Sequence, residues 1–110
     1  MLRRAALIVI AILATATTAA AQTPGPDRLV GTVGVDHLLG RGGDDWIKGR
    51  ADNDYLNGGR GNDTIFGDAG NDRIIGGPGN DTLLGGSGRD RVFADPQDDV
   101  AKDCESVERG

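Results

Sequence analysis

The sequence predicts an all-β repeat protein built from short strands and glycine-rich turns, and three observations carry this prediction. From Gly31 to Lys102, the 110-residue chain divides without a gap into eight frames of nine residues. The sixth position is Asp and the eighth is aliphatic in every frame, and the first is Gly in seven of the eight. Composition agrees, because 19 glycines and only 4% aromatic residues exclude a large enzyme with its own substrate domain.

The first segment, residues 1–21, is predicted to be a secretory signal peptide. Arg3 and Arg4 precede an apolar stretch over residues 5–14, and residues 19–21 (Ala-Ala-Ala) fit a cleavage site before Gln22. These ten strongly apolar residues are about half of the ~20 that a membrane-spanning helix needs, which disfavours an uncleaved membrane anchor. We therefore expect a secreted, extracellular chain with no membrane span after cleavage.

The remaining chain, residues 22–110, is acidic. Its ten basic and 17 acidic residues give a net charge of -7, against -5 for the whole sequence. Nucleic acids and anionic membranes favour clustered Lys and Arg, so no nucleic-acid partner is expected, and a charged partner is expected to be a cation. The one cysteine, Cys104, cannot form an internal disulfide, and we expect a free or partly buried thiol rather than a bond to another chain.

Each frame is predicted to form a turn followed by a short strand. Glycine supplies positive φ angles and close backbone approach, so positions one to six form the turn. Positions seven to nine form a strand whose middle side chain points inward while its two neighbours point outward. The predicted inward row is Leu38, Ile47, Leu56, Ile65, Ile74, Leu83, Val92 and Ala101.

Frames such as GGPGNDTLL and GGRGNDTIF resemble the GGxGxDxUx nonapeptide of RTX, or haemolysin-type, calcium-binding proteins. The resemblance extends over residues 22–102, nearly the whole chain after the leader. It implies a right-handed parallel β-roll, a two-sheet solenoid in which two nonapeptides form one turn. It also implies calcium ions between loops stacked on the same side of the roll. Residues 103–110 would form a C-terminal cap or tail.

The resemblance further implies two columns of carboxylates whose neighbours are 18 residues apart in the chain. Chemistry independently favours calcium, because this hard cation takes Asp carboxylates and turn carbonyls, whereas zinc would want His or Cys, and the chain has one of each. Magnesium is a weaker candidate because it demands tighter octahedral geometry. Without a cation, neighbouring carboxylates within each column would repel one another. The predicted calcium ligands are Asp36, Asp45, Asp54, Asp63, Asp72, Asp81 and Asp90.

The predicted sites are unequal. Asp36 is expected to pair with Asp54 less securely, because Thr32 and Val33 replace turn-forming residues. Asp52 stands in place of a fourth-position glycine, and it either adds a carboxylate to the site or disrupts the turn. Asp27 and Asp99, at the two ends, are interpreted as ordinary turn or capping residues. About four to five calcium ions are expected, mainly between the pairs Asp45–Asp63, Asp63–Asp81, Asp54–Asp72 and Asp72–Asp90.

Apolar residues also occupy the outward ninth position, as Leu39, Ile75 and Phe93 on one sheet and as Phe66 and Leu84 on the other. We expect them to be half covered by the next turn or by the tail; a surface for a partner or for self-association is the alternative.

The predicted function is calcium binding, with calcium-induced folding of a small exported surface, adhesion or partner-binding module. One aliphatic side chain per frame makes a thin core, so the chain without calcium is expected to be largely disordered. No activated nucleophile, G-x-S-x-G or phosphate loop is present in the sequence, His37 is expected to be solvated, and no enzymatic activity is expected. The alternative is an accessory subunit, an inhibitor or an enzyme that acts on a secreted partner through the strand faces or tail.

Overall fold

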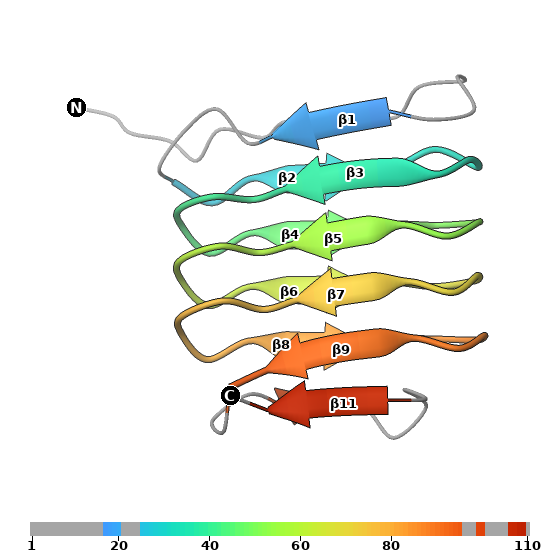
Figure 1. The fold of residues 1–110 in the computed structure, drawn as a ribbon. Helices are drawn as coiled ribbons and strands as arrows, with labels where there is room; N and C mark the ends of the chain where they lie inside the picture. The colour runs from blue at the N-terminus through green and yellow to red at the C-terminus, as the bar shows by residue number, and fades with distance from the viewer. Residues whose placement is uncertain (1–16, 21–24, 96–98, 101–105, 110) are drawn as a thin grey trace.

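The structure, a computed structural model, describes the backbone of residues 17–20, 25–95, 99–100 and 106–109 and the side chains of residues 25–95. All elements in these ranges are strands, and they form two parallel sheets (Figure 1). Sheet A has the order β1 (Thr17–Ala20), β3 (Asp36–Leu39), β5 (Tyr55–Asn57), β7 (Arg73–Ile75), β9 (Arg91–Ala94) and β11 (Ser106–Arg109). Sheet B has the order β10 (Asp99–Val100), β8 (Thr82–Leu84), β6 (Thr64–Phe66), β4 (Trp46–Lys48) and β2 (Arg28–Val30).

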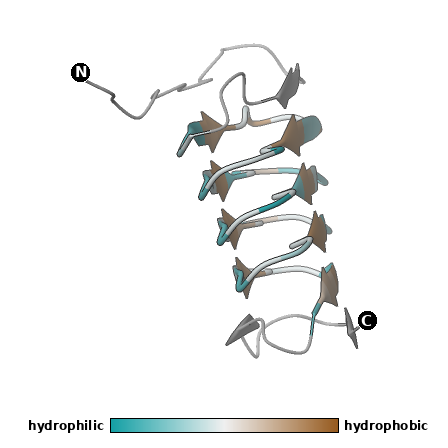
Figure 2. Ribbon diagram, turned by 90° about the vertical axis from the view of Figure 1, so that its left-hand side faces the viewer, coloured by the Kyte–Doolittle hydropathy of each residue, from teal (hydrophilic) through white to brown (hydrophobic). Residues whose placement is uncertain are grey.

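From β2 to β9, consecutive strands alternate between the two sheets, so two nonapeptides make one turn of the solenoid. Residues 18 apart are register partners, as in Leu38↔Leu56 of sheet A and Ile47↔Ile65 of sheet B. Figure 2, a quarter turn from Figure 1, shows the strands as two facing columns joined by the loops. The predicted parallel β-roll is confirmed.

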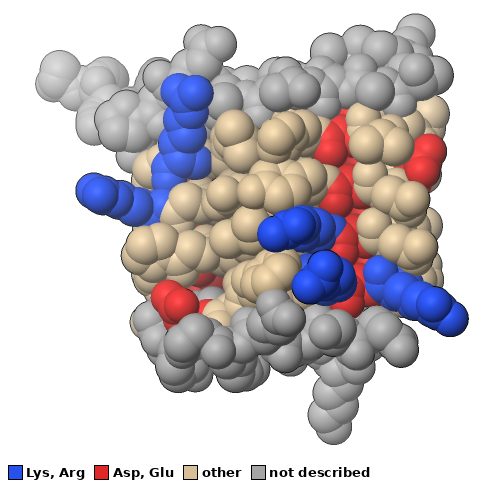
Figure 3. Space-filling view, viewed as in Figure 1, with Lys and Arg blue, Asp and Glu red and all other residues tan. Residues whose placement is uncertain are grey.

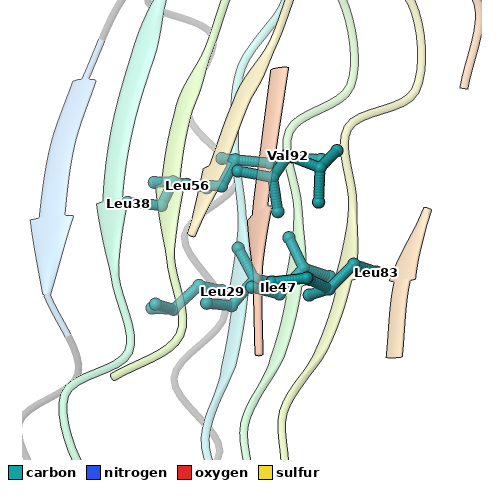
Figure 4. Packing of buried hydrophobic residues seen from close by; sticks show 9 residues of the cluster. Leu29, Leu38, Ile47, Leu56, Leu83 and Val92 are labelled. Atoms are coloured by element: carbon teal, nitrogen blue, oxygen red, sulfur yellow. The ribbon is translucent and has the colours of Figure 1, made fainter. Parts of the chain in front are cut away.

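The core is a double row of aliphatic side chains between the sheets. The residue at the eighth position of each frame, from Leu29 of β2 to Val92 of β9, is 0% exposed, as the alternation of side chains along a strand predicts. Figure 4 shows Leu38, Leu56 and Val92 of sheet A in one row and Leu29, Ile47 and Leu83 of sheet B in the other. Ala94, 3% exposed, adds to the core at the end of β9. The predicted inward position of Ala101 is wrong, because the last frame is shifted by one residue and Val100 of β10 is the register partner of Leu83. Ala101 itself lies outside the described residues.

Hydrogen bonds between turns continue past both ends of the three-residue strands. The Gly40 N–H, at the first position, donates to the Asn57 carbonyl in the next turn at 2.7 Å. The Thr64 N–H, at the seventh position, donates to the Asp45 carbonyl in the previous turn at 2.8 Å. The same two bonds recur along the roll, so the loops that follow and precede each strand are held in register with their neighbours.

Some predicted segments fall partly outside the described residues. Of the predicted leader, residues 1–21, the structure describes only Thr17–Ala20, whose backbone pairs with β3 as strand β1. Of the predicted tail, residues 103–110, it describes β11, which pairs with β9, while Cys104 is not described. In the part of the chain that is described, no helix is long and apolar enough to cross a membrane.

Candidate metal centre

The sixth-position aspartates are buried at the start of the strands. Because side chains alternate along a strand, the sixth position points to the same side as the aliphatic eighth position, toward the interior. All eight aspartates in this position between residues 27 and 90 are between 0% and 4% exposed. Seven of them are the predicted calcium ligands. Burying so many carboxylates is costly unless each receives a compensating charge or hydrogen bonds.

These aspartates stand in two columns, one along each edge of the roll, and one oxygen of each carboxylate is bonded along its column. Oδ1 of Asp63 accepts the N–H of Asp45 at 2.8 Å, and Oδ1 of Asp81 accepts the N–H of Asp63 at 2.7 Å. The opposite edge repeats this bond from Asp36 to Asp54 at 2.8 Å, from Asp54 to Asp72 at 2.9 Å and from Asp72 to Asp90 at 2.8 Å. Figure 3 shows acidic residues in a column along the right-hand edge of sheet A.

The second carboxylate oxygen has no such bond. Oδ2 of Asp45, Asp54, Asp63 and Asp72 is buried and accepts no hydrogen bond from the residues that the structure describes. A buried, unsatisfied carboxylate oxygen at the same place in successive turns is the environment that a bound cation would stabilise.

Burial raises the pKa of these carboxyls. The pKa is about 6 for Asp45, about 7 for Asp54 and about 8 for Asp63 and Asp72, against an ordinary value of 3.8. Withdrawal from water is the main cause; the N–H bonded to Oδ1 opposes it, and the negative charge of neighbouring aspartates adds to it. The folded columns therefore favour protonated carboxyls unless a cation balances their charge.

The first-position glycine makes room for the second oxygen. A Cβ placed on Gly40 would lie 2.6 Å from Asp45 Oδ2 and 2.6 Å from the Gly58 carbonyl oxygen of the next turn. Gly67 has the same surroundings, with Asp72 Oδ2 and the Gly85 carbonyl oxygen each at 2.6 Å. A carboxylate oxygen and a backbone carbonyl oxygen thus border a space that any side chain would fill. These are the two kinds of ligand that calcium prefers in proteins.

Positive φ angles occur at the second and fourth positions of the turns, which confirms the turn conformation predicted from glycine. At the fourth position, Gly79 has φ 124 and faces the Gly61 carbonyl closely enough to exclude a Cβ. Three second-position residues that are not glycine adopt the same conformation, namely Arg41 (φ 72), Arg50 (φ 80) and Asp68 (φ 69). The stacked turns therefore impose this backbone even where the side chain opposes it.

The fifth-position side chains form a second ladder, which the sequence analysis did not predict. Oδ1 of Asp44 accepts the Asn62 N–H at 2.8 Å, and Oδ1 of Asn62 accepts the Asn80 N–H at 2.9 Å. Here the N–H belongs to the later turn, whereas in the sixth-position ladder it belongs to the earlier turn. Each loop is therefore bonded to its neighbours in both directions. The recurring Asn before Asp was the available signal.

Asp52 has a local role in this second ladder. In the previous turn on that edge, the fifth position is Val35, which has no side-chain oxygen to accept the Asn53 N–H. The Asn53 N–H instead bonds to Asp52 Oδ1 at 2.9 Å, and Asn53 Oδ1 then accepts the Asn71 N–H at 2.7 Å. Asp52 takes the positive φ of the missing glycine, at 72. Asp52 therefore does not disrupt the turn, and that one of its two interpretations is wrong.

Asp36 differs from the other predicted ligands because the chain satisfies both of its oxygens. Oδ1 accepts the Thr32 hydroxyl at 2.8 Å, and Oδ2 accepts the Thr32 N–H at 2.5 Å. The same hydroxyl oxygen accepts the Gly34 N–H at 3.1 Å. Thr32 is itself fully buried. The Asp36 carboxylate is thus stabilised without a metal.

Within the described residues, no three His, Cys, Asp or Glu side chains converge as a metal-binding group. A cation between two stacked loops would accordingly be held by carboxylates of neighbouring turns together with backbone carbonyl oxygens. This donor set is suited to calcium and unsuited to zinc.

The outward strand positions carry aromatic and basic side chains. His37 is exposed, as predicted, and its ring packs edge-on against Tyr55 with 4.3 Å between centroids. The ninth-position residues Leu39, Ile75 and Phe93 are half-buried. For Phe93, arginines contribute to the cover, because the guanidinium carbons of Arg73 and Arg91 lie 4.9 and 5.5 Å from its ring centroid.

Comparison with family models gives a match to the RTX calcium-binding nonapeptide repeat (4 copies) over residues 23–56, 30–65 and 66–101. These matches together span most of the chain and coincide with the loops and strands described above. Comparison with curated proteins and with solved structures gave no match.

Proposed function

Because the chain belongs to the family of RTX calcium-binding nonapeptide repeat proteins, we propose that it is a small exported module that folds when calcium fills its two loop columns. The repeats imply calcium binding by the chain. Beyond that, the proposal assigns the ions to particular carboxylates and makes them a condition of folding.

One observation carries the proposal: the row of buried, unbonded Oδ2 atoms of Asp45, Asp54, Asp63 and Asp72. Bound calcium would supply the positive charge that offsets burial and mutual repulsion of the columns. Asp81 and Asp90 continue the same columns through their bonded Oδ1 atoms. Asp36 remains the weakest of the seven candidate ligands because Thr32 already bonds both of its oxygens.

Coupling between calcium and folding follows from the thin core. Each nonapeptide contributes one fully buried aliphatic side chain, and that burial must offset the ordering of a glycine-rich turn. We propose that without calcium the repeats are largely unfolded, and that ions in the four central loop pairs complete the fold. The role that follows is non-enzymatic: a surface, adhesion or partner-binding module outside the cell.

Calcium titration of the purified protein tests this function. Circular dichroism in chelator should show little β-structure, which should rise as calcium is added, and calorimetry should detect about four to five bound ions. A complete β signal in excess chelator would refute the coupling. Absence of any heat of calcium binding would refute the function itself.

A matched pair of variants tests the assignment of ligands. Asp63→Asn removes the charge of a carboxylate shared by two proposed loop pairs, whereas Asp44→Asn removes the same charge from the exposed fifth position, where other frames have Asn. Asp63→Asn should lower the number of bound ions and raise the calcium concentration needed for folding. Asp44→Asn should leave both close to wild type. Equal effects of the two variants would contradict the assignment.

A further inference from the structure

One asparagine of the chain is followed by glycine. Asn57 precedes Gly58, whereas each of the other four asparagines precedes an aspartate. A backbone nitrogen can attack the side-chain amide of the asparagine before it, and glycine, which has no Cβ, hinders this attack least. Asn57–Gly58 is therefore the pair in this sequence that is most disposed to lose side-chain ammonia.

The folded roll holds both reacting groups in place. Asn57 is the last residue of β5, in register with Leu39 on one side and Ile75 on the other. Gly58 is buried, and its N–H donates to the Ile75 carbonyl of the next turn at 2.9 Å. The Asn57 side-chain oxygen accepts the Gly59 N–H at 3.0 Å. Attack would require the Gly58 nitrogen to leave its hydrogen bond and the Asn57 backbone to rotate, and the strand pairing opposes both.

The pair also lies at the start of a proposed calcium loop. Gly58 is the first residue of the frame that contains Asp63, and a Cβ on Gly58 would meet the Asp63 carboxylate. Asp63 belongs to two of the proposed loop pairs. Calcium that orders this loop would therefore also hold the Gly58 N–H on the Ile75 carbonyl.

We propose that Asn57 is a deamidation site which the calcium-bound fold closes, and which opens when the chain lacks calcium. This inference deepens the proposed function and rests on it, since it requires the repeats to be unfolded without calcium. The deamidated residue would be a covalent record of time that the chain has spent without calcium.

The reaction needs only water besides the chain. The Gly58 nitrogen forms a bond to Asn57 Cγ, the bond between Cγ and Nδ2 breaks, and Nδ2 leaves as ammonia with the proton of the Gly58 N–H. The product is a five-membered cyclic imide. Water then adds to one of the two imide carbonyl carbons and opens the ring, which gives either aspartate or isoaspartate at residue 57.

The two products should affect the roll differently. Aspartate keeps the backbone length and a side-chain oxygen that can accept the Gly59 N–H. Isoaspartate adds one carbon atom to the backbone between β5 and the following loop. That atom would displace Gly58 from the Ile75 carbonyl and shift the loop that carries Asp63. Isoaspartate should therefore prevent calcium from refolding this turn.

Incubation of the purified protein at one slightly alkaline pH, in chelator or in saturating calcium, tests the proposal. Peptide mass spectrometry measures deamidation of Asn57, and the four Asn-Asp pairs, at Asn53, Asn62, Asn71 and Asn80, are references in the same sample. Asn57 should deamidate at least about tenfold faster in chelator than in calcium, because with calcium only the rare opened chain reacts. In chelator, Asn57 should also react faster than any of the four references.

Two variants separate the chemical change from its effect on folding. After long incubation in chelator, the wild-type protein should recover less β-structure on addition of calcium than a fresh sample, as measured by circular dichroism. Asn57→Gln would have to form a larger, less favourable ring and should recover in full. Asn57→Asp has the charge of the deamidated product on a backbone of ordinary length, so a fresh sample should fold with calcium as wild type does.

Circular dichroism also distinguishes failure of this inference from failure of the proposed function. Equal deamidation of Asn57 in the two solutions, in a protein that calcium folds, would overturn this inference alone. A chain that is fully folded in chelator would refute both the coupling and the inference. Full recovery of wild-type protein in which isoaspartate has formed at residue 57 would refute the predicted effect on the roll.

Discussion

The side-chain hydroxyl of Thr32 donates a hydrogen bond to Oδ1 of Asp36 at 2.8 Å, and the Thr32 N–H donates to Oδ2 of the same carboxylate at 2.5 Å. Two donors from one residue thus stand where the following turns leave Oδ2 unbonded. In the first complete loop of the roll, the chain itself therefore satisfies both oxygens of the sixth-position carboxylate.

Replacing Thr32 by Gly should therefore increase the number of bound calcium ions by about one. Glycine removes the hydroxyl donor and can adopt the positive φ of the other second positions, which would turn the N–H of residue 32 away from Asp36 Oδ2 and free the carboxylate to act with Asp54. Thr32→Val is the matched control, because it removes the hydroxyl and keeps a β-branched side chain. It should lower the free energy of unfolding in calcium by about 1 kcal/mol without adding an ion. Calorimetric titration gives the ion count, and an unchanged count for Thr32→Gly would contradict the role of Thr32.

Gly40→Ala should disrupt the space beside Asp45. The added Cβ would meet Asp45 Oδ2 and the Gly58 carbonyl oxygen at 2.6 Å, so one of them must move, at a cost of about 1–3 kcal/mol. Gly42→Ala, two residues away, has no atom within 4 Å of its new Cβ and should be neutral or slightly stabilising. Calcium-dependent folding followed by circular dichroism should shift to higher calcium only for Gly40→Ala; the same shift for both variants would refute the steric explanation.

Acid should partly replace calcium. The folded pKa values of Asp45, Asp54, Asp63 and Asp72 lie between about 6 and about 8, above the ordinary 3.8. The folded state therefore binds more protons than the unfolded state at any pH between the ordinary value and the folded values. Stability without calcium should rise as the pH falls from about 8, and should be complete near the ordinary carboxyl pKa of 3.8. Circular dichroism in chelator should show β-structure increasing over this range.

The same protons should compete with calcium, so the apparent calcium affinity should fall over the same pH range. β-structure in chelator that decreases on acidification would show that these carboxyls are not withdrawn from water in the folded chain.

Asp52 and Val35 should be energetically coupled. Asp52 accepts the Asn53 N–H, a bond that a fifth-position oxygen at residue 35 would make in the regular pattern. Val35→Asn should therefore stabilise the protein more when Asp52 is replaced by Gly than in the wild-type chain, with a coupling energy of about 0.5–1 kcal/mol. Denaturant unfolding of the four proteins of this cycle in calcium measures it. Simple additivity would show that the two residues do not serve the same N–H.

The nine-residue period was enough to predict the strands and the core, because alternation along a strand fixes which of positions seven to nine points inward. The resemblance to the RTX repeat, rather than the period alone, implied that the aspartates stand in two columns. It did not predict which carboxylate oxygen is bonded, since that depends on how loops 18 residues apart are stacked. Nor did it predict the second-position backbone at Arg41 and Arg50, where neighbouring turns override the preference of the side chain.

The roll separates the residues that build it from those that meet solvent. Glycine at positions one and four, aspartate at position six and an aliphatic residue at position eight determine the architecture. Positions seven and nine of each strand form the outer surface of the sheets. Substitutions at positions seven and nine can thus change the outer surface of the molecule without changing its scaffold. A repertoire of different specificities could be engineered on one unchanged set of edges.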